Sequence, residues 1–303
     1  MSDADESNAT PSFFARNHFL LRRLHSLSGI LPVGVFVIAH LFTNAQLVWG
    51  QEEGPEGHSV FQHEVDFIHS IPALLFIEIA LWGSIAFHAA LGLWYTFTGK
   101  HNVQHYKYKD NYRYTLQRIT GIVALVFIFL HIATLRWRWD IFGWFTPFWA
   151  HGGVVNGEKI GEDVPMSIPY TAYALQTGLV VVLFYLVGVM SVVFHWANGL
   201  WTAAISWGVT TSEAAMRRWG YACAGLFVAL TVFFLAAMGG ALRYNPYDDT
   251  TDDQKVVLAL SIKNEADAQG LLKEVDWDRV SDELKAQVAG MVDFDTDVES
   301  GSD

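Results

Sequence analysis

The chain is poor in charge and in cysteine. Only 17% of its 303 residues are charged, against roughly 25% in an average soluble domain. The single cysteine, Cys223, cannot form a disulfide within the chain, and we expect it to be a small buried hydrophobe. The formal net charge of −12 argues against a nucleic-acid-binding protein. The hydrophobic share of 52%, with 12 Trp and 21 Phe, argues against a disordered acidic protein.

The acidic excess belongs to one end of the chain. Residues 1–243 hold 14 Lys and Arg against 15 Asp and Glu, whereas residues 244–303 hold 5 against 16. An acidic tail therefore follows a nearly neutral, apolar body. Four apolar residues of the tail share a helical face and predict a short amphipathic helix within 272–291, and the rest of the tail is expected to be mobile. These four residues are Val280, Leu284, Val288 and Met291.

Five stretches of the body are long and apolar enough to cross a bilayer, which takes about 20 mainly apolar residues. They lie between Arg23 and Glu52, between Asp66 and Lys100, between Arg118 and Arg136, near 172–200, and between Arg218 and Arg243. Whole turns carry no charge on any face, whereas helices of a soluble core alternate apolar and charged faces. The sequence therefore predicts an all-α membrane protein, with five transmembrane helices within residues 24–243.

The lysines and arginines predict the orientation of these helices. With residues 1–23 in the cytoplasm, the inner segments hold ten Lys or Arg and the outer loops hold four. Cytoplasmic loops favour positive charge, so the N-terminus is placed inside. Five spans then place the acidic tail, residues 244–303, outside the cytoplasm. The first 22 residues show no cleavable signal pattern, so we expect the first span to remain as an anchor.

Four of the 12 histidines lie inside apolar runs, one on each of the first four spans. Each one alone would be explained equally well by a hydrogen bond to a neighbouring helix. At 1.5 Å per residue, His40 and His131 lie ~21 Å from the cytoplasmic end, and His88 and His195 lie ~8–12 Å from it. Two stacked imidazole pairs are the layout of two bis-histidine haems in a four-helix core, which leaves the fifth helix outside that core. Zinc would need its ligands to converge at one depth.

The sequence around the histidines repeats. Residues 87–94 match residues 194–201 at six of eight positions, including the Phe-His and Gly-Leu-Trp segments. Gly92 and Gly199 lie one turn beyond their histidines on the same face. A missing side chain there would let a flat macrocycle approach, although close packing of two helices also favours glycine. A weaker repeat relates Leu24-x-x-x-Ser28-Gly29-Ile30 to Leu116-x-x-x-Thr120-Gly121-Ile122.

Over roughly residues 14–243, these motifs resemble the single-polypeptide, five-helix dihaem cytochrome b subunit of succinate dehydrogenases and fumarate reductases. The resemblance rests on residues 22–27 (Arg-Arg-Leu-His-Ser-Leu), Pro32-Val33-Gly34, Ala39-His40-Leu41, residues 116–122 and residues 194–201. It implies a multi-pass anchor in a bacterial cytoplasmic membrane, with no flavin or dicarboxylate site of its own. The anchor would carry electrons between cytoplasmic flavoprotein and iron–sulfur subunits and membrane quinone, with menaquinone favoured.

The resemblance also implies a pairing of the histidines. It implies that His88 and His195 hold the haem b that is proximal to the partner subunits, and that His40 and His131 hold the distal one. Loop 137–171 is long for such a protein, and the tail after Arg243 has no counterpart in it.

Two further groups of residues are candidates for the site. Glu78 is the only carboxylate inside a span, and together with Glu64, Asp66 and His69 it would handle quinone protons. A hydrogen bond within the bundle would explain it equally well. Cations at the inner ends of spans one and three would pair with haem propionates or satisfy the positive-inside preference. These cations are Arg22, Arg23, His25 and Arg118.

The inner basic rim, Lys100, Lys107 and Lys109, would dock the iron–sulfur subunit or attract anionic lipid. Two other classes stay open. One is the dihaem arm of a hydrogenase or formate dehydrogenase, against which the paired Phe-His motif argues. The other is a transporter or anchor without haem, in which the histidines relay protons.

Overall fold

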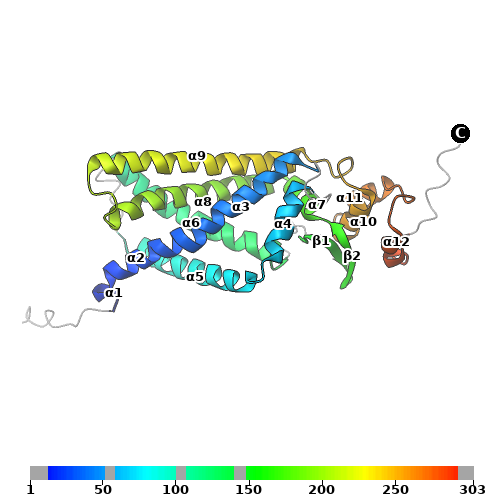
Figure 1. Ribbon diagram of the computed structural model, residues 1–303, viewed down its shortest axis with the longest axis horizontal. Helices are drawn as coiled ribbons and strands as arrows, with labels where there is room; N and C mark the ends of the chain where they lie inside the picture. The colour runs from blue at the N-terminus through cyan, green and yellow to red at the C-terminus, as the bar shows by residue number, and fades with distance from the viewer. Residues whose placement is uncertain (1–12, 52–58, 100–106, 140–147, 293–303) are drawn as a thin grey trace, which may run out of the picture. The chain divides into compact units, whose positions relative to one another are not determined.

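The computed structural model describes residues 13–51, 59–99, 107–139 and 148–292. Five of its helical segments are long and apolar enough to cross a membrane. They are His18–Trp49 (α2, η2, α3 and η3), Leu74–Thr98 (α5), Lys109–Leu135 (α6), Leu179–Ser206 (α8) and Glu213–Arg243 (α9) (Figure 1). The predicted all-α membrane architecture with five spans is confirmed.

The apolar side chains of these helices are largely not buried within the protein. Only 6% of the most apolar window of α5 is buried, and only 17% of that of α8. On α5, Phe76 and Phe97 are 74% and 77% exposed. A soluble helical protein would bury such side chains in its core, so these surfaces are the lipid-facing surfaces of membrane helices.

The first span is not a continuous α-helix. His18–Ser28 (α2) leads into a π-helical turn, Gly29–Gly34 (η2), which is followed by Val35–Ala45 (α3) and the 3₁₀ turn Gln46–Trp49 (η3). Pro32 lies inside the π-helical turn. Proline has no N–H group and its ring clashes with the preceding helical turn, so a regular α-helix is disfavoured there. Such π turns are often found at functional positions.

The chain divides into two compact units, and each unit contains one of the two histidine pairs. Unit 1, with His88 and His195, consists of Met1–Ile38, Leu75–Val123 and Ser191–Val228. Unit 2, with His40 and His131, consists of Ala39–Leu74, Ala124–Met190 and Ala229–Asp303. Cys223 is buried in α9, as expected.

Unit 2 contains a β-hairpin within residues 137–171. Strands His151–Val155 (β1) and Glu158–Pro165 (β2) pair antiparallel, with Val155 opposite Glu158. The two connecting residues, Asn156 and Gly157, both have positive φ, at 51° and 89°. Asn-Gly is the typical pair of a two-residue hairpin turn, because these residues tolerate positive φ. The Asn-Gly pair is thus a local sequence signal for this hairpin.

The acidic tail folds against this hairpin. It forms Asp252–Ser261 (α10), Glu265–Lys273 (α11) and Asp282–Val288 (α12), and α7 (Ser167–Gln176) precedes it along the chain (Figure 1). Side chains of Thr251, Asn264 and Ser281 cap the three helices by accepting hydrogen bonds from backbone N–H groups. The hydrophobic core that these helices share with the hairpin and α7 includes Ile160, Tyr170, Val257, Leu271 and Leu284. We call β1, β2, α7, α10, α11 and α12 the hairpin module.

The prediction that the rest of the tail is mobile is therefore wrong for residues 244–271, because α10 and α11 pack into a hydrophobic core. The predicted amphipathic helix exists as α12, although it is shorter than the range 272–291. Val280, Leu284 and Val288 are buried, as the helical pattern predicted. Residues 293–303 lie outside the described residues.

A second core within unit 2 joins the hairpin module to the ends of the spans. It includes side chains from η3, Val60–Ser70 (α4), α7, α8 and α9, and from Tyr244 just beyond α9. Its buried members are Leu47, Phe61, Ile168, Ala172, Leu175, Val181, Ala237, Ala241 and Tyr244. The module is thus a packed part of unit 2.

Candidate functional site

His88 on α5 and His195 on α8 face each other in unit 1. Their ring centroids are 6.0 Å apart and the ring planes are perpendicular. His88 Nδ1 lies 2.8 Å from the backbone oxygen of His25, and His195 Nδ1 lies 2.9 Å from that of Gln117. A carbonyl oxygen only accepts hydrogen bonds, so both Nδ1 atoms carry the proton and both Nε2 atoms keep a free lone pair. Histidines that bind a metal through Nε2 have this arrangement.

Two glycines make room for these rings. A β-carbon on Gly29 would lie 2.5 Å from Cε1 of His88, and one on Gly121 would lie 2.7 Å from Cε1 of His195. Each glycine comes four residues after the residue whose carbonyl holds the ring. Spans one and three therefore each provide one backbone carbonyl and one glycine that accommodate an imidazole ring, which accounts for their weak sequence repeat. We call each such combination of a carbonyl and a glycine a glycine seat.

The glycines of the stronger repeat lie next to these seats. A β-carbon on Gly92 would lie 3.2 Å from Cε1 of His25, and one on Gly199 would lie 3.3 Å from Nε2 of Gln117. Both would crowd the side chain whose backbone holds a histidine. Their predicted role beside a macrocycle stays a prediction.

On the His195 side of the pair, polar side chains form a connected set of hydrogen bonds. Gln117 Nε2 donates to the backbone oxygen of His195 (2.9 Å), and Asn198 Nδ2 donates to Gln117 Oε1 (2.7 Å). Arg113 in turn donates to Asn198 Oδ1 (2.7 Å) and lies over the ring of Trp201. The polar side chains on this side of the pair therefore find their hydrogen-bond partners within the protein.

Elsewhere in unit 1, several buried polar atoms lack hydrogen-bond partners. His25 Nδ1, Tyr95 Oη, Trp196 Nε1, and Nε and Nη1 of Arg118 are buried without a hydrogen-bond partner. His25 stacks on His88 with ring centroids 4.0 Å apart, and Tyr95 lies edge-on to His25. Buried polar groups in folded proteins are almost always paired. The unpaired donors near the histidine pair can therefore bind a ligand that carries acceptor oxygens.

The predicted cations of unit 1 lie partly in this region. Nη2 of Arg118 donates to the backbone oxygen of Tyr95 (3.2 Å), in the last turn of α5, where carbonyls lack helical partners. Arg22 lies over the Tyr95 ring, 5.8 Å from its centroid. Arg23 is exposed on α2. The structure therefore brings Arg22, His25 and Arg118 together around Tyr95.

His40 on α3 and His131 on α6 form the corresponding pair in unit 2. Their ring centroids are also 6.0 Å apart, with planes inclined at 72°. His131 Nδ1 lies 3.2 Å from the hydroxyl oxygen of Tyr185 on α8. Asn44 donates to the backbone oxygen of His40 (2.7 Å), and its Nδ2 lies 3.4 Å from the ring nitrogen Nδ1. The ring nitrogens of this pair are contacted by side chains.

Both pairs have the spacing of two ligands on opposite sides of one metal. With metal–nitrogen bonds of about 2 Å, two opposed imidazoles have ring centroids roughly 6 Å apart, and both pairs have 6.0 Å. Within the described ranges, no group of three or more His, Cys, Asp or Glu side chains is placed to hold a metal ion. A haem needs only two axial ligands from the protein, so the donor sets fit haem b.

The predicted proton-handling residues are distributed over two helices and both units. Asp66 on α4 pairs with Nε2 of His151 (2.9 Å) and accepts a hydrogen bond from Gln62 (2.8 Å). His69 is exposed in the last turn of α4, and Glu64 is half-buried on the same helix. Glu78 is half-buried on α5 and belongs to unit 1.

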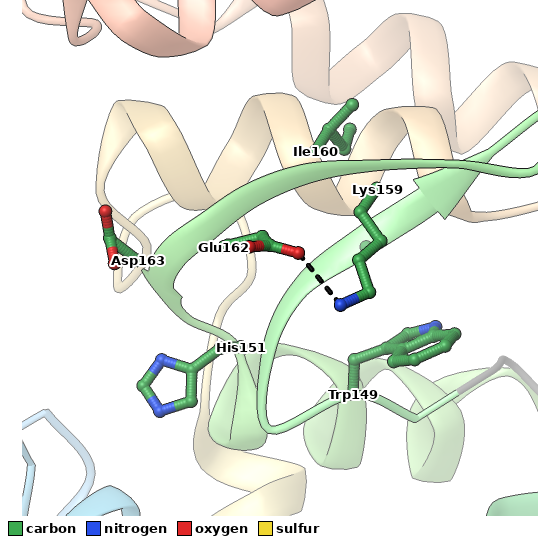
Figure 2. Close-up of a pocket in the computed structure, with 7 residues that line it drawn as sticks. Trp149, His151, Lys159, Ile160, Glu162 and Asp163 are labelled. Carbon is green, nitrogen blue, oxygen red and sulfur yellow. Dashed lines mark ion pairs between the residues drawn. The ribbon is translucent and has the colours of Figure 1, made fainter.

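His151, the partner of Asp66, is not among the site residues predicted from the sequence. His151 lines a pocket of about 610 Å³ on the hairpin, together with Trp149, Lys159, Glu162 and Asp163. Figure 2 shows the ion pair of Lys159 with Glu162 (2.9 Å) at this pocket. Both of these side chains are exposed. The pocket combines charged side chains with the apolar side chains of Trp149 and Ile160.

Of the predicted basic rim, Lys107 is exposed, whereas Lys100 and the side chain of Lys109 lie outside the described residues.

A bundle of apolar helices that carries opposed histidines on facing spans is the architecture of membrane cytochromes b. The chain is 34% identical over 221 residues to the succinate dehydrogenase cytochrome b558 subunit of Bacillus subtilis (strain 168). This match covers 73% of the chain and 95% of that protein. The chain therefore belongs to the succinate dehydrogenase cytochrome b subunit family, which confirms the resemblance. No family model and no solved structure matches the chain.

Proposed function

We propose that the chain relays electrons through two bis-histidine haems b between an iron–sulfur subunit and membrane quinone, as the membrane anchor of a succinate:quinone oxidoreductase. The observation that carries this proposal is the pair of 6.0 Å imidazole–imidazole separations, one in each unit. His88 and His195 hold the haem proximal to the iron–sulfur subunit, and His40 and His131 hold the distal one. The name of the Bacillus subtilis relative supports the succinate branch over a hydrogenase or formate dehydrogenase arm.

Haem b supplies one-electron redox chemistry when it is bound. Two histidines would hold each haem, which would leave no position on the iron for oxygen or a substrate, so the chemistry that the haem would supply is electron transfer. The carbonyls of His25 and Gln117 hold the axial rings of unit 1 in one tautomer. Gly92 on α5 and Gly199 on α8 lack side chains and would let a macrocycle approach these helices once the side chains of His25 and Gln117 give way.

Arg22, Arg23, His25 and Arg118 bind the propionates of the proximal haem. The unpaired, buried atoms of His25 and Arg118 support this role, because propionate oxygens accept charge-assisted hydrogen bonds.

Menaquinone is the proposed electron acceptor, with Glu78, Glu64, Asp66 and His69 handling its protons. The 2.9 Å contact of Asp66 with Nε2 of His151 supports a proton-handling role for Asp66, because a carboxylate and an imidazole at hydrogen-bond distance can pass a proton between them. The side chains of Asp66 and His151 are 29% and 33% exposed, so solvent can exchange protons with the pair.

The flavoprotein and iron–sulfur subunits dock on the cytoplasmic side, which is the side of the N-terminal segment 1–23. Lys100, Lys107 and Lys109 belong to the docking rim, while the dihaem body 24–243 spans the membrane. The acidic tail 244–303 lies outside the cytoplasm. The distribution of lysine and arginine supports this orientation.

A reduced-minus-oxidised visible spectrum of the purified protein, followed by reduction with succinate in the assembled complex, tests this function. We expect b-type bands, two haems per chain, and reduction of both by succinate. The absence of b-type bands would contradict the haem proposal. Bands that succinate does not reduce would instead contradict the assigned place in a succinate:quinone oxidoreductase.

A further inference from the structure

The two units hold their histidines by different chemical groups. In unit 1, both ring Nδ1 atoms lie on backbone carbonyls, at 2.8 and 2.9 Å. In unit 2, the Nδ1 atom of His131 lies 3.2 Å from a tyrosine hydroxyl, that of Tyr185. A backbone carbonyl cannot be removed by substitution, whereas a hydroxyl can. Only in unit 2 is the partner of an axial imidazole open to such a test.

The hydroxyl of Tyr185 is held in place by aromatic packing around His131. Phe127 stacks on the His131 ring, with centroids 5.5 Å apart and planes inclined at 22°. Tyr185 lies edge-on to both rings, 5.7 Å from His131 and 5.6 Å from Phe127. Phe184 also packs edge-on against Tyr185, at 5.5 Å. These contacts restrict the rotation of the phenol ring, so its oxygen stays beside Nδ1.

Gly188 preserves this packing. A β-carbon at Gly188 would overlap the ring of Phe127. Gly188 lies three residues after Tyr185 on α8, so one turn of one helix provides both the hydroxyl and the space for the stacked ring. The arrangement resembles the glycine seats of unit 1 in its use of a glycine, but the hydrogen-bonding group is a side chain.

We propose that Tyr185 is a positioning residue for the axial ligand His131. This inference rests on the proposed function, because it assumes that His131 binds haem iron. The Nδ1–H group of His131 donates to the Tyr185 oxygen, which fixes the ring orientation and leaves Nε2 for the iron. The same hydrogen bond makes the imidazole a stronger electron donor. A stronger donor stabilises ferric over ferrous iron, so Tyr185 holds this haem in its oxidised form more than packing alone would.

The test is a redox titration of the purified complex carrying Tyr185→Phe, with the low-spin ferric signals of the two haems followed by electron paramagnetic resonance. The phenylalanine ring keeps the aromatic packing and removes only the oxygen. At a fixed potential, we expect the ratio of reduced to oxidised haem to rise roughly fivefold, the factor of one ordinary hydrogen bond. The change should affect one of the two haems, and the haem held by His88 and His195 serves as the internal control.

Tyr173→Phe is the matched control, because it removes a hydroxyl that donates to Asp267 (2.7 Å) in the hairpin module. We expect it to leave both haems unchanged. If Tyr185→Phe does not fold, Phe127→Leu provides the second variant. It keeps the hydroxyl but removes the ring that restrains it, so a smaller shift of the same haem is expected.

The outcomes separate this inference from the proposed function. Wild-type protein without two b-type signals would overturn the proposed function itself. Two normal wild-type haems, with neither shifted in Tyr185→Phe, would overturn the role of Tyr185. A shift of equal size in both haems, or in Tyr173→Phe as well, would overturn it too.

Discussion

The histidine pairs of unit 1 and unit 2 have the same separation and different surroundings. In both, the ring centroids are 6.0 Å apart. In unit 1, the rings lie on main-chain carbonyls and against glycines, while several donors near them stay unpaired. In unit 2, the rings are contacted by Asn44, Phe127 and Tyr185. The equal separation fits one proposed haem iron per pair, whereas the groups that contact the imidazoles differ between the two units.

The largest expected effect comes from removing one ligand of each pair in turn. In the assembled complex, His88→Ala should abolish reduction of the proximal haem by succinate and lower electron flow to quinone by orders of magnitude. His131→Ala should leave the haem of unit 1 reducible by succinate and block only the later transfer to quinone. Rapid-mixing absorbance spectroscopy distinguishes the two cases. Equal loss of succinate-reducible haem in both variants would contradict the assigned order of the haems.

Next in size is the effect of filling a glycine seat. Gly29→Ala would place a β-carbon 2.5 Å from His88, whose ring is held by the carbonyl of His25. Overpacking of this kind costs about 1–3 kcal/mol, so the haem of unit 1 should be partly lost and that of unit 2 retained. Haem content and the thermal unfolding midpoint measure this.

Gly83→Ala, on α5 of the same unit, is the matched control for the glycine seat. A β-carbon at Gly83 would meet no atom within 4 Å. Gly83→Ala should therefore preserve both haems. A loss of haem in Gly83→Ala equal to that in Gly29→Ala would contradict the claim that the effect at Gly29 comes from a steric clash with His88.

A third prediction concerns the hairpin module, which unit 1 lacks. Burial raises the pKa of Tyr170 to about 12, well above its usual value near 10, and its hydroxyl donates to Ser261 (2.8 Å). Because the folded state holds this proton more tightly, the stabilisation is complete below pH 10 and is lost as the pH rises through 12. The loss amounts to about 2–3 kcal/mol, at 1.36 kcal/mol per pKa unit.

Unfolding of unit 2 followed between pH 9 and 12 measures this loss. In Tyr170→Phe, the part of the pH dependence that is due to this hydroxyl should disappear. An unchanged profile would show that Tyr170 does not titrate with unfolding.

The smallest expected effect is that of removing the contact between the Asp66 carboxylate and the His151 imidazole. Both side chains are about one-third exposed, so solvent weakens their attraction and Asp66→Asn should cost at most about 1 kcal/mol. If Asp66 handles quinone protons, the same variant should slow quinone turnover much more than it lowers stability. Turnover with unchanged rate and pH profile would assign Asp66 a structural role alone.

The membrane part of the fold was predictable because its signal is local. A span of about 20 apolar residues is visible in the sequence, and so are four histidines within such spans. The contacts that orient His88 and His195 were not predictable from the sequence. Every residue has a main-chain carbonyl, so no residue type indicates which carbonyls accept these hydrogen bonds. The seat glycines Gly29 and Gly121 were visible only as a weak repeat.

The hairpin module escaped prediction for other reasons. Its core combines Ile160 and Tyr170 with Val257 and Leu284, which are distant in sequence. Local signals in the acidic tail, such as the capping box of Thr251 with Gln254 and the apolar run that follows it, indicate a helix but not the elements it packs against. The Asn156-Gly157 pair predicts a turn and says nothing about the helices that pack on the hairpin.

The most direct test of the central claim is the ratio of haem to polypeptide in the purified protein, compared among three chains. Wild type should contain two haems b per chain. His195→Ala, which breaks the pair of unit 1, and His40→Ala, which breaks the pair of unit 2, should each contain one, with different remaining spectra. A wild-type ratio of one, or the same remaining haem in both variants, would contradict the assignment of one haem to each histidine pair.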